Sequence, residues 1–175
     1  DPENPSQHII DMSENEIEVP EDYTREELRQ DLLCYTSPVL KEDLVLTGDM
    51  TAELYISSDA PDTDFVVRVT DVDENGRSIK LADGLLSARY RNGFAQSEFL
   101  QEGEIVCLKI RTTKLSNCFR KGHRIRVTVT SSAKNFIFPN SNTREGFASA
   151  RTVVAHNRVY HGGLHASRLT VRVEP

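Results

Sequence analysis

The chain has 175 residues, a length that fits one domain with a sizeable core. Hydrophobic residues make up 38% and there is no Trp, which is lean for a globular domain but richer than a disordered chain. The net charge of −6 conceals a gradient: residues 1–31 carry eleven Asp or Glu against two Arg, whereas residues 109–175 carry thirteen Lys or Arg against two Glu. This asymmetry indicates complementary charge on packed elements or on a partner domain. It does not favour nucleic acid, because the basic residues lack interleaved aromatics.

Residues 1–31 are expected to form an acidic linker that leads into the domain. The run Asp1-Pro2-Glu3-Asn4-Pro5 holds two prolines, which remove backbone donors and disfavour helix and central strand. Thr24 followed by Glu27 predicts a capping box and a short helix or turn over residues 25–33. Because the first residue is Asp and not Met, we expect the chain to be part of a longer polypeptide. No apolar run has the length of a membrane span, so no membrane partner is expected.

From Leu32 onward the hydrophobic pattern has a period of two. Met50, Ala52, Leu54 and Ile56 alternate with polar neighbours, as in a half-buried strand. Asn75-Gly76 is a strong hairpin signal, because both residues tolerate a positive φ. The predicted strands cover residues 50–56, 65–72, 78–81, 85–90, 105–111, 125–130, 151–156 and 169–173. Short strands joined by polar turns predict an all-β domain over residues 32–175, an antiparallel sandwich or jelly roll.

Three groups of polar residues are candidates for a metal site. Asp71-x-Asp73-x-Asn75-Gly76 resembles half of an EF-hand loop, but Ala82 stands where the bidentate glutamate belongs, which favours a polar hairpin. The loop of Asp59, Asp62 and Asp64 suits either a self-bonded turn or a hard cation, and the turn is favoured. The histidines at 156, 161 and 165 flank Gly162-Gly163 and are interpreted as a surface turn. No metal is therefore assigned.

The motifs of the common enzyme classes are missing from these 175 residues. There is no G-x-S-x-G elbow, P-loop, dinucleotide fingerprint or H-E-x-x-H. The three cysteines form no C-x-x-C pair, and Cys34 and Cys107 lie in strand-like runs where a buried hydrophobe is the ordinary interpretation. No catalytic residue and no cofactor are expected on this chain, so it is not expected to be an enzyme by itself.

The basic strand Arg124-Ile125-Arg126-Val127-Thr128-Val129-Thr130 has two faces. The two arginines share one face, and the aliphatic residues share the other. The arginine face is either solvated or directed at an acidic partner, and the pattern leaves both open.

A series of short motifs, in order along the chain, resembles one known domain. They are LCYTSPVL (33–40), SSDAPDTDF (57–65), DGLLSARYR (83–91), KGHRIR (121–126), PNSNT (139–143) and VYH (159–161). Together they resemble the C-terminal domain of the X-Pro dipeptidyl-peptidase and cocaine-esterase-type acyl esterase family. The chain departs from the usual pattern in its longer acidic stretch before Leu33 and in Gly162-Gly163-Leu164.

The resemblance implies a jelly-roll β-sandwich of the galactose-binding-like type, attached to an α/β-hydrolase domain of the same polypeptide. In that family the catalytic triad belongs to the hydrolase domain, so no triad residue is carried onto this chain. The implied role is to pack on the catalytic domain, to shape the entrance of its active site and to support homo-oligomers. The residues expected to make interdomain contacts are Asp62, Asp64, Phe65, Arg89, Tyr90, Arg91, Asn140 and Asn142.

The alternative is a freestanding carbohydrate- or ligand-binding jelly roll. Sugar-binding faces usually stack exposed aromatic rings on the sugar, and the chain has no Trp and five Tyr, which counts against this function. Substrate, peptidase or esterase activity and cellular compartment depend on residues outside this sequence.

Overall fold

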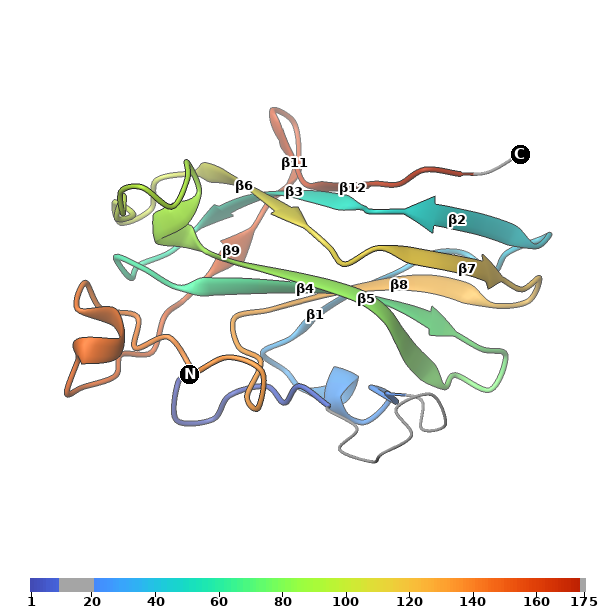
Figure 1. Ribbon diagram of the computed structural model, residues 1–175, viewed down its shortest axis with the longest axis horizontal. Helices are drawn as coiled ribbons and strands as arrows, with labels where there is room; N and C mark the ends of the chain where they lie inside the picture. The colour runs from blue at the N-terminus through green and yellow to red at the C-terminus, as the bar shows by residue number, and fades with distance from the viewer. Residues whose placement is uncertain (10–20, 174–175) are drawn as a thin grey trace.

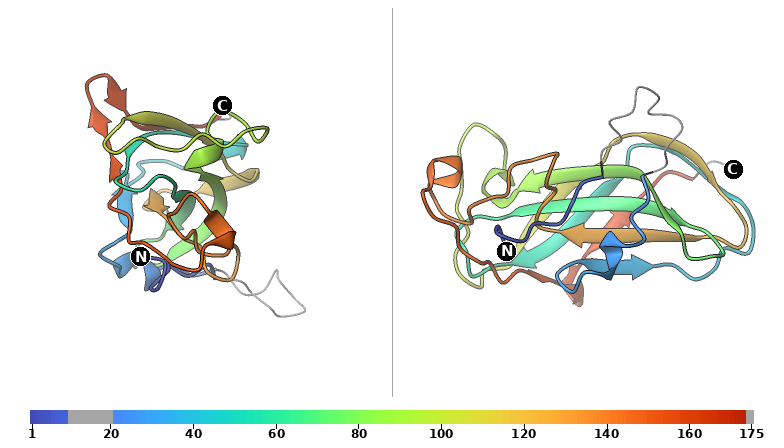
Figure 2. Two further views of the ribbon diagram at one scale, coloured as in Figure 1. Left: turned by 90° about the vertical axis from the view of Figure 1, so that its left-hand side faces the viewer. Right: turned by 90° about the horizontal axis from the view of Figure 1, so that it is seen from below.

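The computed structural model describes residues 1–9 and 21–173, which form an all-β fold of antiparallel sheets (Figure 1). The described residues form no α-helix, only the 3-10 turns η1 (Glu26–Leu28), η2 (Ala88–Tyr90) and η3 (Gly146–Ala148). Two layers of strands face each other, as the views in Figure 2 show. Within residues 1–9 and 21–173 no helical segment has the length and hydrophobicity to cross a membrane.

The first layer is a four-stranded sheet in the order β1-β8-β4-β5. Its strands are β1 (Leu33–Thr36), β8 (Arg124–Thr130), β4 (Asp64–Val72) and β5 (Ser78–Ser87). The second layer has the order β12-β3-β6, with β9 also paired to β3. Its strands are β12 (Arg168–Thr170), β3 (Thr51–Ser57), β6 (Val106–Arg111) and β9 (Arg158–Val159). Two shorter pairs complete the fold: β2 (Leu44–Gly48) with β7 (Leu115–Phe119), and β10 (His161–Gly162) with β11 (His165–Ala166).

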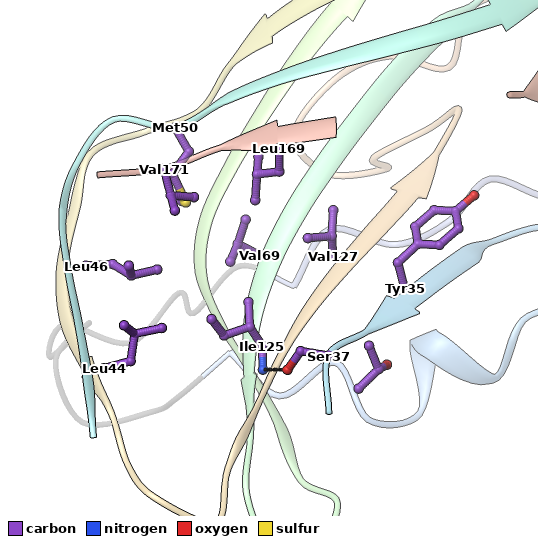
Figure 3. Close-up of a pocket in the computed structure, with 11 residues that line it drawn as sticks. Tyr35, Ser37, Leu44, Leu46, Met50, Val69, Ile125, Val127, Leu169 and Val171 are labelled. Carbon is purple, nitrogen blue, oxygen red and sulfur yellow. Dashed lines mark hydrogen bonds between the residues drawn. The ribbon is translucent and has the colours of Figure 1, made fainter. Parts of the chain in front are cut away.

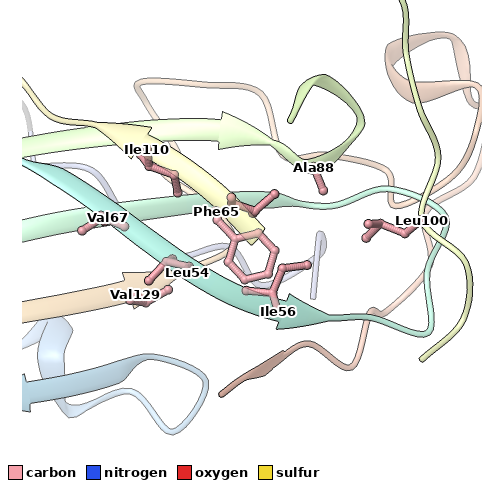
Figure 4. Close-up of a cluster of buried hydrophobic side chains, with 10 residues drawn as sticks. Leu54, Ile56, Phe65, Val67, Ala88, Leu100, Ile110 and Val129 are labelled. Carbon is pink, nitrogen blue, oxygen red and sulfur yellow. The ribbon is translucent and has the colours of Figure 1, made fainter. Parts of the chain in front are cut away.

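The apolar core lies between the two layers (Figure 4). On β4 the side chains of Phe65, Val67 and Val69 point into it, because alternate residues of a strand share a face. Burying a side chain of this size contributes about 2 kcal/mol relative to exposure. The main cluster consists of Ala52, Leu54, Ile56, Phe65, Val67, Ala88, Leu100, Leu108, Ile110 and Val129.

The opposite face of β4 is buried as well, although its residues are mostly polar. Arg68 and Thr70 are 0% exposed there. The covering is the N-terminal part of the chain: the ring of Tyr23 lies 4.6 Å from the Arg68 guanidinium carbon, and the Glu27 carboxylate accepts a hydrogen bond from Ser78 of β5. Residues 6–9 and 21–27 therefore pack on the sheet. The expected division at residue 32 stays a prediction about domain organisation.

The arginine face of β8 meets an acidic residue of the same chain. Arg126 Nη1 lies 2.5 Å from the Glu27 carboxylate, whose side chain is 3% exposed, and Arg126 Nε donates to Thr36. Arg124 donates to the carbonyl oxygen of Ser37. At this pair, the acidic N-terminal segment and the basic C-terminal half therefore carry complementary charges on elements that pack together.

Several local predictions are confirmed and others are wrong. The hairpin at Asn75-Gly76 forms, with Gly76 at φ +84° and the Asp73 carboxylate accepting from the amides of Asn75 and Arg77. The predicted strands 78–81 and 85–90 are one strand, β5, which a bulge opposite Val69 and Thr70 interrupts and which gives way to η2 at Ala88.

Residues 151–156 form no strand, because their backbone amides bond to loops. Val153 N donates to Ser141 O and His156 N donates to the Asp59 carboxylate. β2 and β7 were not predicted. Cys34 is exposed, so the interpretation as a buried hydrophobe is wrong for that residue.

The capping box predicted at Thr24 and Glu27 does not form. The Thr24 hydroxyl donates to Asp22 and accepts from the Ser78 amide, and η1 has no side-chain cap. The Glu27 side chain instead points toward the sheet, where its carboxylate accepts hydrogen bonds from the hydroxyl groups of Thr70 and Ser78.

Replacing Glu27 by Ala should lower the free energy of unfolding by about 3 kcal/mol, because the partly buried Arg126 then loses its carboxylate. Urea denaturation measures this loss. The matched substitution Glu42→Ala, at an exposed position, should change stability by less than about 0.5 kcal/mol. Equal midpoints for the two variants would contradict the structural role of Glu27.

Candidate interdomain contact surface

Three loops gather at one end of the sandwich, on the left in Figure 1; we call it the loop end. They are residues 58–63 between β3 and β4, residues 91–105 after η2, and residues 131–157 between β8 and β9. Backbone hydrogen bonds join the first two, from Leu100 to Pro61 and from Gly103 to Ser58. Residues 1–3 lie at the same end, where Thr152 donates to the Glu3 carboxylate at 2.8 Å.

An ion pair between Asp62 and Arg89 holds the loop end together. The Arg89 Nε lies 2.7 Å from Asp62 Oδ2, and the Arg89 backbone amide donates to Oδ1 at 2.9 Å. Asp62 is 1% exposed, so its charge depends on these donors for compensation. The same guanidinium donates to the carbonyl oxygens of Thr143 and Arg144, which ties η2 to the long loop.

Asn140 joins two carboxylates, that of Asp62 in the loop preceding β4 and that of Asp64 at the start of β4. Its Nδ2 donates to Asp62 at 2.7 Å and to Asp64 at 2.9 Å. Burial raises the pKa of Asp64 above its ordinary value, and the hydrogen bonds from Ser87 and Asn140 oppose that effect. Asn140 Oδ1 in turn accepts from the amide of Asn142, whose φ is +60°. The motifs SSDAPDTDF, DGLLSARYR and PNSNT therefore meet in one network.

The predicted contact residues differ in their positions and burial in the structure. Asp62, Asp64, Arg89 and Asn140 come together and brace the loops, with the two aspartates buried and Arg89 and Asn140 half-buried. Phe65 is 1% exposed and belongs to the core, so its side chain is not available to a partner, which corrects the expectation for this residue. Arg89 and Tyr90 lie in a 3-10 turn, whereas a strand was expected to continue to residue 90.

A cleft of about 270 Å³ opens beside this network. It is bounded by Asp64, Arg89, Tyr90, Asn140 and Glu145, among others. Arg91 is turned inward, donating to the carbonyl oxygens of Ala88 and Glu98, and Asn142 donates to Val153 O. Of the eight predicted contact residues, five line this cleft: Asp62, Asp64, Arg89, Tyr90 and Asn140.

Phe94 and Phe99 are among the aromatic residues of the loop end that the sequence analysis missed. Phe94 is 81% exposed, and its ring centre lies 5.5 Å from that of Tyr90. Phe99 lies between two guanidinium groups, at 5.1 Å from Arg89 and 4.6 Å from Arg144. The signal that could have found Phe94 is its position directly after Asn92-Gly93, because this turn sequence predicts a loop tip at which an aromatic side chain is exposed.

The metal candidates are dispersed. Asp59 accepts from His156 at 2.7 Å, and the backbone hydrogen bond from His156 is the first cause that lowers the pKa of Asp59. His161 bonds Tyr35 at 2.9 Å, and His165 lies against the ring of Tyr55. In the part of the chain that the structure describes, no three His, Cys, Asp or Glu side chains are grouped to hold a metal ion.

A second cleft, of about 360 Å³, lies along the side of the sandwich between the two layers (Figure 3). Aliphatic side chains such as Leu44, Val127 and Leu169 line it, and Tyr35 and Ser37 stand at its polar rim. Within residues 1–9 and 21–173 no charged side chain lines this cleft, and it lies away from the loop end. It is therefore an apolar opening of the core.

Replacing Arg89 by Ala should lower the free energy of unfolding by about 3–5 kcal/mol, because Asp62 is left as an uncompensated buried charge. Arg89→Lys should restore little, because an ammonium cannot reproduce the forked contacts. As control, Arg111→Ala removes a pair with Asp49 whose arginine side chain is 70% exposed and should cost less than about 1 kcal/mol. Thermal and urea unfolding measure both, and similar losses for Arg89 and Arg111 would contradict the bracing role.

Known proteins resemble this chain in sequence and in fold. Residues 6–170 match the model of a family described as the X-Pro dipeptidyl-peptidase C-terminal non-catalytic domain. Over 150 residues the chain is 37% identical to cocaine esterase of a Rhodococcus species, an alignment that covers 83% of this chain and 26% of the esterase.

Two solved structures share the fold. An aminopeptidase from the marine sediment archaeon Thaumarchaeota archaeon aligns with a TM-score of 0.91 and 24% identity over 100% of this chain and 32% of its own. An α-amino acid ester hydrolase aligns with a TM-score of 0.88 and 23% identity over 99% of this chain and 31% of its own. The chain spans about a quarter to a third of these relatives. It belongs to the family of X-Pro dipeptidyl-peptidase C-terminal non-catalytic domains, which in these relatives is one part of a larger chain.

Proposed function

We propose that this chain is the accessory domain of a serine hydrolase of the X-Pro dipeptidyl-peptidase or acyl esterase type. In this proposal it packs on an α/β-hydrolase domain of the same polypeptide, which carries the nucleophile, the base and the acid. The observation that carries the proposal is the family match over residues 6–170 together with the 26% of the esterase that the chain covers. The domain's proposed role is to form part of the entrance of the active site and to fix its shape.

The proposed contact surface is the loop end. A C-terminal domain receives the rest of its polypeptide at its own N-terminus, and Asp1 and Pro2 border a cleft with Asn142 and His156 of the long loop. The exposed ring of Phe94, whose centre lies 5.5 Å from that of the Tyr90 ring, is the apolar anchor there. The network of Asp62, Arg89 and Asn140 holds the loops in a fixed shape, which reduces the entropy lost on docking.

The finer fold assignment, a jelly roll of the galactose-binding-like type, is part of the same proposal. Two facing antiparallel layers support it, as do the non-consecutive neighbours β8 and β4 in one layer and β12 and β3 in the other. Such crossings between layers are typical of Greek-key sandwiches. Homo-oligomers, in which the loop end of each copy would still face its own hydrolase domain, remain part of the proposal.

One observation favours a second function, a module that binds a carbohydrate or another hydroxyl-rich ligand. The cleft under Asp1 and Pro2 measures about 330 Å³, and amide and hydroxyl side chains line it together with apolar ones. Among the described residues, the Asn157 Oδ1 in this cleft has no hydrogen-bond partner. Calorimetric titration of a glycan panel into the chain tests this. Saturable binding would support the ligand-binding module, and the accessory-domain proposal predicts none.

The isolated chain should hydrolyse an activated ester, such as a p-nitrophenyl ester, no faster than buffer does. A full-length protein carrying the upstream domain should turn it over, and a serine-reactive inhibitor should abolish that turnover. Inhibitor-sensitive turnover by the isolated chain would contradict the assignment of catalysis to the other domain.

The docking role of Phe94 can be tested in a full-length protein with a protease site inserted before Asp1. After cleavage the two pieces should co-elute in gel filtration, and Phe94→Asp should weaken their association at least about tenfold, because a charge replaces an apolar anchor. The control is Leu164→Asp, which introduces the same charge at a 91% exposed position of the β10–β11 hairpin. Equal association of both variants would contradict docking through the loop end.

A further inference from the structure

The N-terminal segment crosses the outer face of the first layer as a strap, which we define as residues 5–9 and 21–24 (Figure 2, right). Each part is held by backbone hydrogen bonds to a different element. His8 N donates to Lys134 O at 2.8 Å, whereas Tyr23 N donates to Ser78 O at 2.8 Å and the Lys80 amide donates to Glu21 O at 3.0 Å. The strap is therefore joined to the loop after β8 and to the free edge of β5.

His8 lies at the centre of this contact and is 6% exposed. Its ring stacks on Phe136 with centres 4.6 Å apart, its Nδ1 lies 3.5 Å from the Tyr23 hydroxyl, and the same nitrogen lies 3.7 Å from the Asp83 carboxylate. The ring is thus enclosed by β5, by the rest of the strap and by the loop after β8.

The charged groups that face His8 balance only while the ring is neutral. Lys80 and Asp83 come from β5, Arg68 comes from β4, and Glu21 comes from the strap. Lys80 Nζ contacts both carboxylates, at 2.5 Å from Glu21 and 3.3 Å from Asp83. Two cations therefore face two carboxylates, and a proton on His8 would leave one positive charge in excess.

Arg68 makes such an excess charge costly. It is 0% exposed, and its Nη2 donates to Gln7 O at 3.2 Å. Among the described residues, its Nε and Nη1 have no hydrogen-bond partner. A second buried cation nearby would add to a guanidinium that is already short of acceptors.

We propose that the strap is an acid-sensitive clasp, which holds at neutral pH and loosens when His8 takes up a proton. In the accessory-domain proposal this strap is also the segment that leads from the hydrolase domain. Loosening it would then allow the two domains to change their relative orientation. That consequence rests on the proposed function. The clasp itself is a property of this chain alone.

The direction of the pH dependence follows from His8. Burial is the first cause of its lowered pKa, Lys80 and Arg68 act in the same direction, and Asp83 and Glu21 oppose them. A folded-state pKa below the ordinary histidine value of about 6.5 means that the unfolded or released strap binds more protons. The clasp therefore has its full stability above about pH 6.5 and loses it as the pH falls toward the folded-state pKa.

Hydrogen exchange on the 175-residue chain tests the clasp. Between about pH 7.5 and pH 5.0, protection factors of the His8 and Tyr23 amides, corrected for intrinsic rates, should fall at least about tenfold. The Val67 amide in the core should change less than about twofold. His8→Gln, which cannot gain a proton in this range, should abolish the fall. The matched control His123→Gln removes the histidine paired with Asp71 and should leave the fall unchanged.

Lys80→Gln provides a test that does not depend on removing His8. This variant deletes a cation that faces the ring and frees two carboxylates, so the midpoint of the fall should move to higher pH. Strap protection that is equal at both pH values, or a fall that persists unchanged in His8→Gln, would overturn the proposal. Because no hydrolase domain is present in this experiment, either result leaves the docking of the loop end to its own test.

Discussion

Burial of both faces of β4 is the constraint on which the rest of this structure depends. Its inner face supplies Phe65, Val67 and Val69 to the core, and its outer face buries Arg68 and Thr70. Buried polar groups need partners, and Tyr23, Gln7 and Glu27 of the N-terminal segment supply them. The acidic beginning of the chain is thereby tied to the sheet, and Glu27 compensates Arg126 of the basic C-terminal half.

The loop end is likewise organised by a buried polar group that needs hydrogen-bond partners. Three segments far apart in the sequence converge because one buried carboxylate, Asp62, needs the donors of Arg89 and Asn140. A long loop that is braced in this way keeps one shape, and that is the property an accessory domain needs if it is to form part of another domain's active-site entrance. Exposed aromatic area at Phe94 then lies on a fixed support.

Local patterns in the sequence predicted much of the fold. The alternation around Leu54, the Asn75-Gly76 turn and the strand after Asp64 depend on neighbouring residues, and all three are confirmed. Residues 151–156 have a strand-like pattern, but their amides bond to Ser141 and Asp59, which no local pattern reveals. Likewise, no local pattern reveals the long-range hydrogen bonds that join Asp62, Arg89 and Asn140 to one another, and their contact with another domain stays a prediction. Phe94, which belongs to no motif, was missed for that reason.

The central claim, that the loop end faces a hydrolase domain, is tested most directly by hydrogen exchange on the full-length protein and on the isolated chain under identical conditions. The account predicts that amides in residues 58–63, 91–105 and 131–157 gain protection in the full-length protein, while the β10–β11 hairpin exchanges equally in both. Protection gained at the hairpin or along the side of the sandwich, with the three loops unchanged, would contradict it.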